Sequence, residues 1–373
     1  MKFQYFKFII FIFFENLNKS PVDSKIQTEL DNANKKVAQL EQDLVNKTKE
    51  YESQIAAFKQ KIKNLENANK AAQVDDESEK SQELKILDSK SLDEFEIISD
   101  IGYGSSGKVV KVSKKKYYAL KILSSETITS EKLRSLLKEW EIMNMLNHPN
   151  ILKSLGIFFS DEKRSPAILL EYCNMNLSDA IKNKMLSNVQ IVCAIYQIVE
   201  GMKYIHFMKI IHRDLKPSNI LIAENGTIKI CDFGNSRLMT PEEYTMTMGI
   251  GTSRFMAPEI IAEADNYNEK VDIYSFGVLV FFILSQGELP KIKIPQILNG
   301  EKASIPSSTF TKSAKNLIRS CWNFDPKDRP SFNDISKLMQ KECCQLLKLS
   351  NGEIKEVQEF IENNQKLIPN YDH

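Results

Sequence analysis

Glycine is distributed unevenly along this chain, and its distribution restricts the fold more than any other feature. None of the first 101 residues is glycine, and then Gly102, Gly104 and Gly107 fall within six residues. A segment without glycine can form an uninterrupted helix, whereas closely spaced glycines let a backbone turn tightly and approach a ligand. The sequence therefore predicts two different parts that join near residue 100.

Composition excludes several classes of protein. Hydrophobic residues make up 42% and charged residues 27% of the 373 residues, which excludes a wholly disordered chain and a polytopic membrane protein. The net charge of +1 lacks the overall basic signature of a nucleic-acid-binding protein, so no nucleic acid partner is expected. The six cysteines form no CxxC pair, which favours a reduced, cytoplasmic setting over a disulfide or zinc framework.

Residues 1–20 form a short apolar segment. The stretch from Phe3 to Phe14 reads FQYFKFIIFIFF, which is shorter than the roughly 20 apolar residues that a membrane span needs. Its length fits the apolar core of a signal peptide, but the ENLNKS that follows offers no small-residue cleavage site. Three interpretations stay open: a segment that contacts a membrane, an unstructured start and a signal peptide.

Residues 22–70 predict a coiled-coil helix. Apolar or small residues alternate at spacings of 4 and 3, with one phase slip at Thr48; the alternation is typical of a heptad repeat, and the slip would locally unwind a supercoil. This seam consists of Ile26, Leu30, Ala33, Val37, Leu40, Leu44, Tyr51, Ile55, Phe58, Ile62 and Leu65. A second copy of the chain is expected to cover so long a stripe, which predicts a homodimer; a single solvated helix is the alternative.

The remainder of the chain predicts an α+β fold. Residues 71–92 are polar and charged and predict a linker with at most one helical turn, around Leu84 to Leu87. Strands are expected at residues 95–98, 117–123, 167–172, 220–222 and 228–230, with a helix over 131–146. Asn225-Gly226 between the last two strands is the strongest short signal for a hairpin. The chain is mainly helical beyond Lys270, so a small β-rich lobe should precede a larger helical lobe.

The first motif with chemical meaning is residues 101–109, IGYGSSGKV, which matches G-x-G-x-x-G-x-V. Alone it is a weak signal, because a dinucleotide-binding turn shares the glycines. That turn is followed at once by a helix and later by an acidic residue. Here strand-like residues follow, with Lys and Tyr among them, so the glycines should lie in a hairpin whose backbone can approach phosphate oxygens.

Further motifs lie in later segments. Ala119-Leu120-Lys121 is an apolar strand with one buried lysine, which would need a carboxylate from the next helix; Glu139 is the first candidate and Glu141 the alternative. Residues 211–221 read IHRDLKPSNIL, residues 232–234 read DFG and residues 257–259 read APE.

Together these motifs resemble the eukaryotic protein kinase family over about residues 95–343. Asp272 to Gly277 (DIYSFG), Cys321-Trp322 and residues 329–332 (RPSF) are similar to the later helices of that family, in its tyrosine-kinase-like group. In the family, the aspartate matching Asp272 braces the catalytic loop and the arginine matching Arg329 pairs with Glu259. The resemblance implies a bilobed kinase fold and an ATP- and Mg²⁺-dependent serine/threonine protein kinase that acts on protein substrates in signalling.

The resemblance also assigns roles to residues. Asp214 would accept the proton of the substrate hydroxyl, and Lys216 would neutralise charge on the transferred phosphoryl group. Lys121, paired with Glu139, would bind the phosphates. Asn219 and Asp232 would hold Mg²⁺. The expected nucleotide contacts are Ile101, Gly102, Tyr103, Gly104, Ser105, Ser106, Gly107, Lys108, Val109, Ala119, Lys121, Leu170, Glu171, Cys173, Asn219, Leu221 and Asp232. Leu170 would be the gatekeeper, with backbone contacts from Glu171 and Cys173, whereas Val109, Ala119 and Leu221 would enclose the adenine; plain core packing is the alternative for these apolar residues.

Two departures from the family pattern matter. Ser106 stands at the tip of the glycine loop, where the family often has an aromatic residue. The stretch after the hinge, NMNLSDAI, lacks the usual glycine, which leaves the ribose contacts unassigned.

The resemblance also suggests how the chain is divided and regulated. The kinase domain is expected at residues 93–345, followed by a helical tail at 346–373 that either packs on the large lobe or recruits a partner. Arg213 would bind a phosphate on the activation segment, with Thr247 the first candidate acceptor and Thr240, Tyr244 and Thr245 the others. Dimerisation would then favour autophosphorylation in trans. A pseudokinase scaffold, a dual-specificity or tyrosine kinase and a small-molecule kinase are the competing interpretations.

Overall fold

The structure, a computed structural model, divides into two units, residues 1–83 and residues 84–373. It describes residues 32, 35–39, 42, 46, 49, 53, 60, 86–87, 89–104, 107–123, 130–159, 165–239, 253–263 and 267–368.

The described residues of the first unit are all helical, and their side chains are exposed. The side chain of Gln42 donates to Asn46 (3.2 Å), one helical turn further on. Val37, which is 39% exposed, is the one seam residue among them. The rest of the predicted coiled-coil seam and the apolar segment 1–20 lie outside the described residues, so the coiled coil and the homodimer stay predictions.

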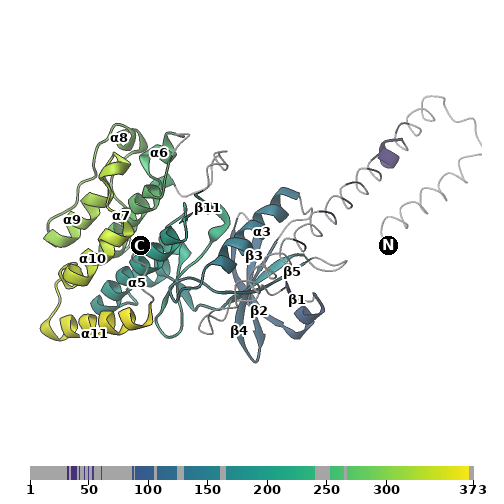
Figure 1. Ribbon diagram of the computed structural model, residues 1–373, viewed down its shortest axis with the longest axis horizontal. Coiled ribbons are helices and arrows are strands. Elements are labelled where there is room, and N and C mark those ends of the chain that lie inside the picture. The colour runs from purple at the N-terminus through teal and green to yellow at the C-terminus, as the bar shows by residue number, and fades with distance from the viewer. Residues whose placement is uncertain are drawn as a thin grey trace, which may run out of the picture. The chain divides into compact units, whose positions relative to one another are not determined.

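The second unit begins with a six-stranded sheet, in the order β1-β5-β6-β4-β3-β2 (Figure 1). Its strands are β1 (Ile86–Leu87), β2 (Glu96–Gly104), β3 (Gly107–Lys114), β4 (Lys116–Ile122), β5 (Ser154–Phe158) and β6 (Ala167–Glu171). All neighbouring pairs are antiparallel except β1 and β5, which are parallel. This sheet is the β-rich lobe that the sequence predicts.

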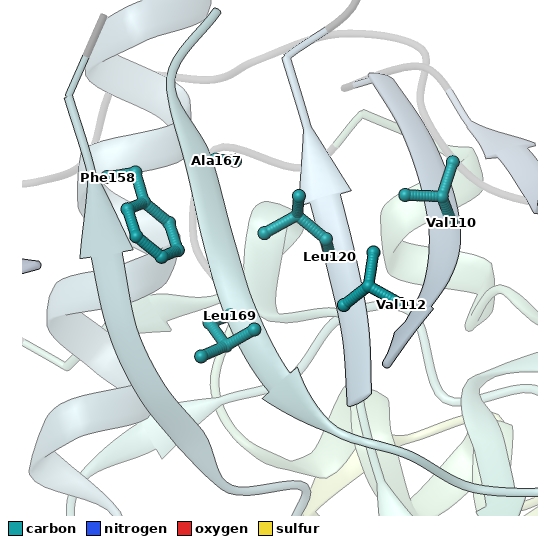
Figure 2. Packing of buried hydrophobic residues seen from close by; sticks show 6 residues of the cluster. All are labelled: Val110, Val112, Leu120, Phe158, Ala167 and Leu169. Carbon is teal, nitrogen blue, oxygen red and sulfur yellow. The ribbon is translucent and has the colours of Figure 1, made fainter. Parts of the chain in front are cut away.

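Alternation along the strands gives the sheet two faces, because successive side chains of a strand point to opposite sides. One face carries the core of the lobe, in which Val110, Val112, Leu120, Phe158, Ala167 and Leu169 are buried (Figure 2). Their sequence neighbours Val109, Ala119 and Lys121 lie on the opposite face, where they line a large cavity. The same alternation therefore builds the hydrophobic core and positions the site.

The end of the predicted linker belongs to this lobe. Ile86 and Leu87 form β1 and pair with Ile157 and Phe158 of β5, and a 3₁₀ helix follows at Ser89–Glu94. Leu87 and Leu92 pack against the core cluster. The helical turn predicted around Leu84 to Leu87 is therefore wrong at Ile86 and Leu87, because these residues pair with β5 at the edge of the sheet and Leu87 packs against its core.

The remaining elements form the predicted helical lobe, apart from α3, which contacts β5 of the sheet (Figure 1). The helices are α3 (Ser130–Met145), α4 (Leu177–Lys182), α5 (Asn188–Phe207), α6 (Pro258–Ile261), α7 (Lys270–Leu284), α8 (Ile294–Leu298), α9 (Lys312–Cys321), α10 (Phe332–Glu342) and α11 (Asn351–Leu367). Short strands lie between them at β7 (Met175–Asn176), β8 (Ile210–Ile211), β9 (Ile220–Ile222), β10 (Ile228–Ile230) and β11 (Arg237–Leu238). Short 3₁₀ helices occur at Pro217–Asn219, Phe233–Asn235, Ser253–Phe255, Pro326–Asp328 and Cys343–Gln345.

The hairpin predicted at Asn225-Gly226 joins β9 and β10. Gly226 has a φ of 80°, a left-handed conformation that glycine adopts without a steric penalty. The side chain of Asn225 accepts the N–H of Thr227 at 3.1 Å, which closes the turn.

Helix α7 is the centre of the helical lobe, since every residue from Val271 to Leu284 is buried. Gly277 permits its contact with the end of α9. A Cβ at this position would lie 2.7 Å from both Cys321 Cβ and Trp322 Cδ1, so a larger residue would push the two elements apart.

The C-terminal helix α11 packs against α5, with Val357 and Ile361 buried on its inner face. Ser350 caps it, since its hydroxyl accepts the N–H of Glu353 and its own N–H is bound by the Glu353 carboxylate. Of the two roles expected for the tail, packing on the large lobe is what the structure shows. Within the described ranges no helix has the length and apolar character to cross a membrane.

Candidate active site

A cavity of about 750 Å³ opens beside the sheet, and strands β2–β4 together with the loops around β9 and β10 form its walls. A cavity of this size suits a nucleotide or another small molecule. Of the residues predicted to act there, its walls include Ile101, Gly102, Tyr103, Gly107, Val109, Ala119, Lys121, Glu139, Leu170, Glu171, Cys173, Asp214, Lys216, Asn219, Leu221 and Asp232. Residues far apart in the sequence thus meet at one place.

The glycine motif forms the predicted hairpin, in which β2 pairs with β3 and Gly104 lies opposite Gly107. Gly107 has a φ of 148°, which few other residues would adopt. Gly104 and Lys108, which the sequence predicts as nucleotide contacts, are not part of the cavity wall. The side chain of Lys108 instead pairs with Asp100 at 2.6 Å. Ser105 and Ser106 lie outside the described residues.

Lys121 is held between two carboxylates. Its Nζ lies 2.6 and 2.7 Å from the two carboxylate oxygens of Glu139 and 3.2 Å from Asp232 Oδ1. Glu139, and not its alternative Glu141, is therefore the partner that α3 supplies. The position of this ammonium group suits the neutralisation of phosphate charge in the cavity.

The charges around Lys121 stabilise one another. Burial alone would lower the pKa of Lys121, but the neighbouring carboxylates outweigh it and raise that pKa above its ordinary value. Burial raises the pKa of Asp232, but Lys121, with smaller effects of His212 and Lys216, lowers it below its ordinary value, so Asp232 ionises more readily than usual. Burial also raises the pKa of Glu139, against the opposing effect of Lys121. Lys121 thus favours the ionised form of both carboxyl groups, and they favour its own charged form.

Asp214, Lys216 and Asn219 form a compact group on the loop after β8. Lys216 Nζ lies 2.7 Å from Asp214 Oδ2. The amide nitrogen of Asn219 donates to the backbone oxygen of Asp214 (2.8 Å) and to Asp214 Oδ2 (3.0 Å). These bonds fix the carboxylate of Asp214 at the cavity wall, where it could accept a proton from a hydroxyl group.

Asp272 of α7 anchors the backbone of this loop by hydrogen bonds. Its carboxylate accepts the backbone N–H groups of His212 and Arg213, each at 2.8 Å, and lies 2.9 Å from His206 Nε2. Burial would raise the pKa of Asp272, but the hydrogen bond from His206 and the other donors lower it below its usual range. Arg213 has a φ of 67°, a strained conformation for a residue with a side chain, which the two backbone bonds of this loop help to maintain.

Asn219 and Asp232 suit a hard cation. The backbone N–H of Cys231 donates to the backbone oxygen of Asn219 at 3.0 Å, which brings the loop of Asp232 beside that of Asn219. Because the amide nitrogen of Asn219 is bound to Asp214, its Oδ1 is the atom left for a ligand. The described residues contain no cluster of three or more His, Cys, Asp or Glu side chains that could hold a metal. Two protein oxygen ligands, supplemented by water and phosphate, agree with the preference of Mg²⁺.

The other end of the cavity is apolar. Val109, Ala119, Leu170 and Leu221 line it, together with Glu171 and Cys173 at the end of β6. Glu171 Oε1 lies 2.9 Å from Lys229 Nζ and accepts the N–H of Lys153 at 2.7 Å. The N–H of Glu171 donates to the backbone oxygen of Lys153 at 3.1 Å, so of its backbone groups the oxygen is the candidate for the expected nucleotide contact. Burial raises the pKa of the Cys173 thiol to about 12, which keeps it neutral.

The wall residues that are absent from the sequence prediction are Met143, Leu152, Tyr172, Asn174, Met175, Asn176, Asp179, Ser218, Cys231 and Asn235. Asp179 is the most informative, because Asn176 caps α4 by accepting the N–H of Asp179 and also donates to its carboxylate, both at 2.9 Å. This exposed carboxylate is a candidate partner for ribose hydroxyls. An asparagine three residues before an aspartate at a helix start is the signal that could have revealed it.

A buried ion pair anchors the segment that follows residues 240–252. The guanidinium of Arg329 binds both carboxylate oxygens of Glu259, at 2.6 and 2.9 Å, and donates to the backbone oxygens of Lys270, Asn323 and Phe324. Arg329 is only 2% exposed, and its donors are well satisfied, as a buried charge requires. The pair that the resemblance implies is present and holds α6 to the helical lobe.

Comparisons with known proteins bear on this arrangement. The family model described as protein kinase domain matches residues 95–342. The chain is 34% identical over 264 residues to an Aurora kinase of Saccharomyces cerevisiae, covering 68% of this chain and 71% of the relative. It is 36% identical over 244 residues to the RGS domain-containing serine/threonine-protein kinase A of Dictyostelium discoideum, covering 63% of this chain and 21% of the relative.

A third similar protein is the mitogen-activated protein kinase kinase kinase dlk-1 of Caenorhabditis elegans, 36% identical over 256 residues, which cover 65% of this chain and 26% of the relative. The matched region spans between 21% and 41% of the length of three Dictyostelium discoideum relatives. The likeness therefore concerns one domain of those longer proteins.

Proposed function

The chain belongs to the protein kinase domain family, and from this premise we propose that it transfers the γ-phosphoryl group of ATP to Ser and Thr hydroxyls of proteins. One observation carries the proposal: the cavity brings the Lys121–Glu139 pair, the Asp214–Asn219 group and Asp232 together on its walls. The proposed function needs each of these groups, and the chain retains all of them.

In the proposed reaction, Lys121 binds phosphate oxygens of ATP, and Asp214 orients the substrate hydroxyl and accepts its proton. Lys216, 2.7 Å from Asp214, offsets the charge on the phosphoryl group during transfer. Asn219 and Asp232 would hold Mg²⁺, which neutralises phosphate charge when it is bound. The protein's contribution is thus positioning and electrostatic stabilisation.

Specificity for Ser and Thr is supported by the lysine two residues after Asp214 and by relatives whose names describe serine/threonine kinases. A dual-specificity or tyrosine kinase is the alternative. We also propose a role in signalling in the cytoplasm, with which six free cysteines agree. Membrane contact through residues 1–20 belongs to the same proposal.

The experiment is a phosphotransfer assay on the full chain with Mg²⁺, labelled ATP and a mixed protein acceptor, followed by phosphoamino acid analysis. We expect phosphoserine and phosphothreonine, and a loss of at least about 10²-fold in the near-isosteric variant Asp214→Asn. Nucleotide binding and thermal unfolding of the variant serve as controls for folding. Nucleotide binding without transfer by the wild type would instead indicate a pseudokinase scaffold, and phosphotyrosine would indicate the alternative specificity.

Activation is proposed to require phosphorylation of the segment that contains Thr240, Tyr244, Thr245 and Thr247, all outside the described residues. Arg213 is the expected phosphate partner; its guanidinium now lies 5.4 Å from the ring centre of Tyr267. Self-association through residues 22–70 would raise the local concentration of one kinase domain for the other. Deletion of residues 22–70 should therefore slow autophosphorylation most at low protein concentration, and an unchanged concentration dependence would contradict this mechanism.

A further inference from the structure

A second cavity, of about 420 Å³, lies in the helical lobe, and it shares no wall residue with the candidate active site. It is formed by residues of α7, of α8 and of the segments on either side of α8, together with one residue of the 3₁₀ helix Ser253–Phe255 and one at the end of α9. The walls consist of Arg254, Tyr274, Val278, Pro290, Ile292, Lys293, Ile294, Ile297, Glu301, Lys302, Ala303 and Trp322. We call this second cavity the docking cavity. The proposed phosphotransfer reaction does not use it.

The floor of the docking cavity is apolar. Tyr274, Val278, Ile297 and Trp322 are each at most 8% exposed. The indole N–H of Trp322 is buried and has no acceptor within the described part of the chain. Such a floor suits one bulky apolar side chain, because aromatic-lined pockets are where a single anchoring residue contributes most to binding.

The mouth of the docking cavity is cationic. Arg254, Lys293 and Lys302 come from three different segments, and all three are exposed. Lys302 donates to the side-chain oxygen of Asn323 (3.1 Å), and the one carboxylate, Glu301, is bound by the amide of Gln296 (2.9 Å). No salt bridge within the described residues neutralises the three cations, so the mouth favours a ligand that carries several negative charges.

Exposed apolar side chains extend the surface beyond the mouth. Ile294 and Leu298, one turn apart on α8, are 40% and 38% exposed, and Phe324 is 49% exposed. The ring of Phe324 lies 3.6 Å from the position that a Cβ of Gly300 would occupy, which places it beside the end of α8. An apolar surface around a pocket is typical of protein–protein contacts. A small molecule would contact only the pocket, so the extended surface favours a protein segment as the ligand.

We propose that the docking cavity binds an acidic segment of the protein substrate through one bulky apolar side chain. That side chain fills the cavity, and carboxylates before and after it face Arg254, Lys293 and Lys302. A peptide suits the three separate cations better than a single lipid headgroup, because its charges are distributed along a chain. This proposal rests on the proposed kinase function, since it names the substrate class of that activity.

A binding experiment tests the site without phosphotransfer. The probe is a fluorescein-labelled peptide with one phenylalanine between two runs of three glutamates and without Ser, Thr or Tyr, titrated against the full chain. We expect saturable binding that Lys293→Glu or the cavity-filling Ala303→Trp weakens by about tenfold. Lys291→Glu is the matched control, because Lys291 is exposed two residues away and does not line the cavity; it should change the affinity by less than about twofold.

Four results would overturn the docking proposal: absence of saturable binding, equal effects of Lys291→Glu and Lys293→Glu, equal affinity when glycine replaces the phenylalanine, or preferential binding of a fluorescent fatty acid. The variant Asp214→Asn should bind the probe as the wild type does. Absence of phosphotransfer by the wild type with intact probe binding would contradict the kinase proposal alone, whereas phosphotransfer by the wild type without probe binding would contradict the docking proposal alone.

A kinetic experiment connects the cavity with catalysis. The acidic segment is joined by a glycine linker to a short serine-containing acceptor peptide. The joined peptide and the acceptor peptide alone are both assayed with the wild type. Docking should lower the KM of the joined peptide by about tenfold with little change in kcat, because this binding is the same in ground state and transition state. Lys293→Glu should abolish the difference in KM; a lower KM that survives this change would contradict the assignment of the site.

Discussion

At the scale of single residues, the charged groups of the active site depend on one another. Glu139 is 2% exposed, and Lys121 is its counter-ion at 2.6 Å. A buried carboxylate whose partner is removed is left with an uncompensated charge, which costs more than the pair itself contributes. The pair is therefore expected to affect both activity and stability, and the two effects can be separated.

Lys121→Met should lower phosphotransfer by at least about 10²-fold and lower the free energy of unfolding by about 3 kcal/mol. The double variant Lys121→Met/Glu139→Leu should recover most of the stability, because no charge is left buried, and none of the activity. Urea denaturation and the phosphotransfer assay measure the two effects. Recovery of activity in the double variant would show that the lysine does not serve the reaction.

The lowered pKa of buried His148 predicts that the stability of the fold depends on pH. Burial, with smaller effects of Lys229 and Lys203, lowers its pKa from 6.5 to about 4. The unfolded chain therefore binds a proton between these values while the folded chain does not, so the stability from this residue is complete above pH 6.5 and is lost as the pH falls toward 4. We expect a loss of about 1–3 kcal/mol over this range.

Urea denaturation at several pH values between 7 and 4.5 measures this effect as a slope. His148→Asn removes the titrating group and should flatten the slope relative to the wild type. An identical slope in the two proteins would assign the acid sensitivity to other groups.

At the scale of elements, close packing of α7 against the end of α9 depends on the absence of one side chain. Gly277→Ala should lower the free energy of unfolding by about 1–3 kcal/mol, because its Cβ would overlap Cys321 and Trp322, which are held by their own elements. Gly352→Ala is the matched control: nothing lies within 4 Å of a Cβ there, and alanine favours the helix by up to about 1 kcal/mol. Thermal unfolding compares the two, and a neutral Gly277→Ala would mean that the contact is looser than described.

The elements also show what a sequence can and cannot reveal. The strands, the Asn225-Gly226 turn and the helix that bears Glu139 follow from local patterns of apolar residues and turn formers. The choice between Glu139 and Glu141 does not follow from such patterns. Residues two apart on a helix point about 200° away from each other, and because α3 buries a wide face, its apolar pattern does not tell which of the two glutamates faces Lys121. Strand β1 escapes prediction for another reason: two residues form it, and its partner Ile157 is distant in the sequence.

Most residues that line the candidate active site were predictable, because its motifs place charged residues at recognisable spacings. Asp179 was not, since only the folded chain brings the start of α4 to the cavity beside β9. The docking cavity had no sequence signal at all. Its cations come from three segments that carry no motif, and their proximity is a property of the fold.

At the scale of the whole molecule, α11 adds a covering layer to the helical lobe. Deletion of residues 347–373 should expose the face of α5 that Val357 and Ile361 cover and lower the free energy of unfolding by about 2–4 kcal/mol. Urea denaturation and binding of a hydrophobic dye measure the loss. Within the full chain, Val357→Ser should act in the same direction, whereas Lys355→Ser, at a side chain that is 78% exposed, should not. A truncated chain of unchanged stability would favour recruitment of a partner as the role of this helix.

Two parts of helix α7 contact two different sites, the loop that bears Asp214 and the docking cavity. Asp272 near its start holds the backbone of His212 and Arg213, while Tyr274 and Val278 form the floor of the docking cavity. Because every residue between Val271 and Leu284 is buried, the helix cannot bend or slide without disrupting the lobe. On the docking proposal, this buried helix would fix the number of residues between the anchoring side chain and the phosphorylated hydroxyl of a substrate, because Asp272 and the floor of the docking cavity belong to the same helix.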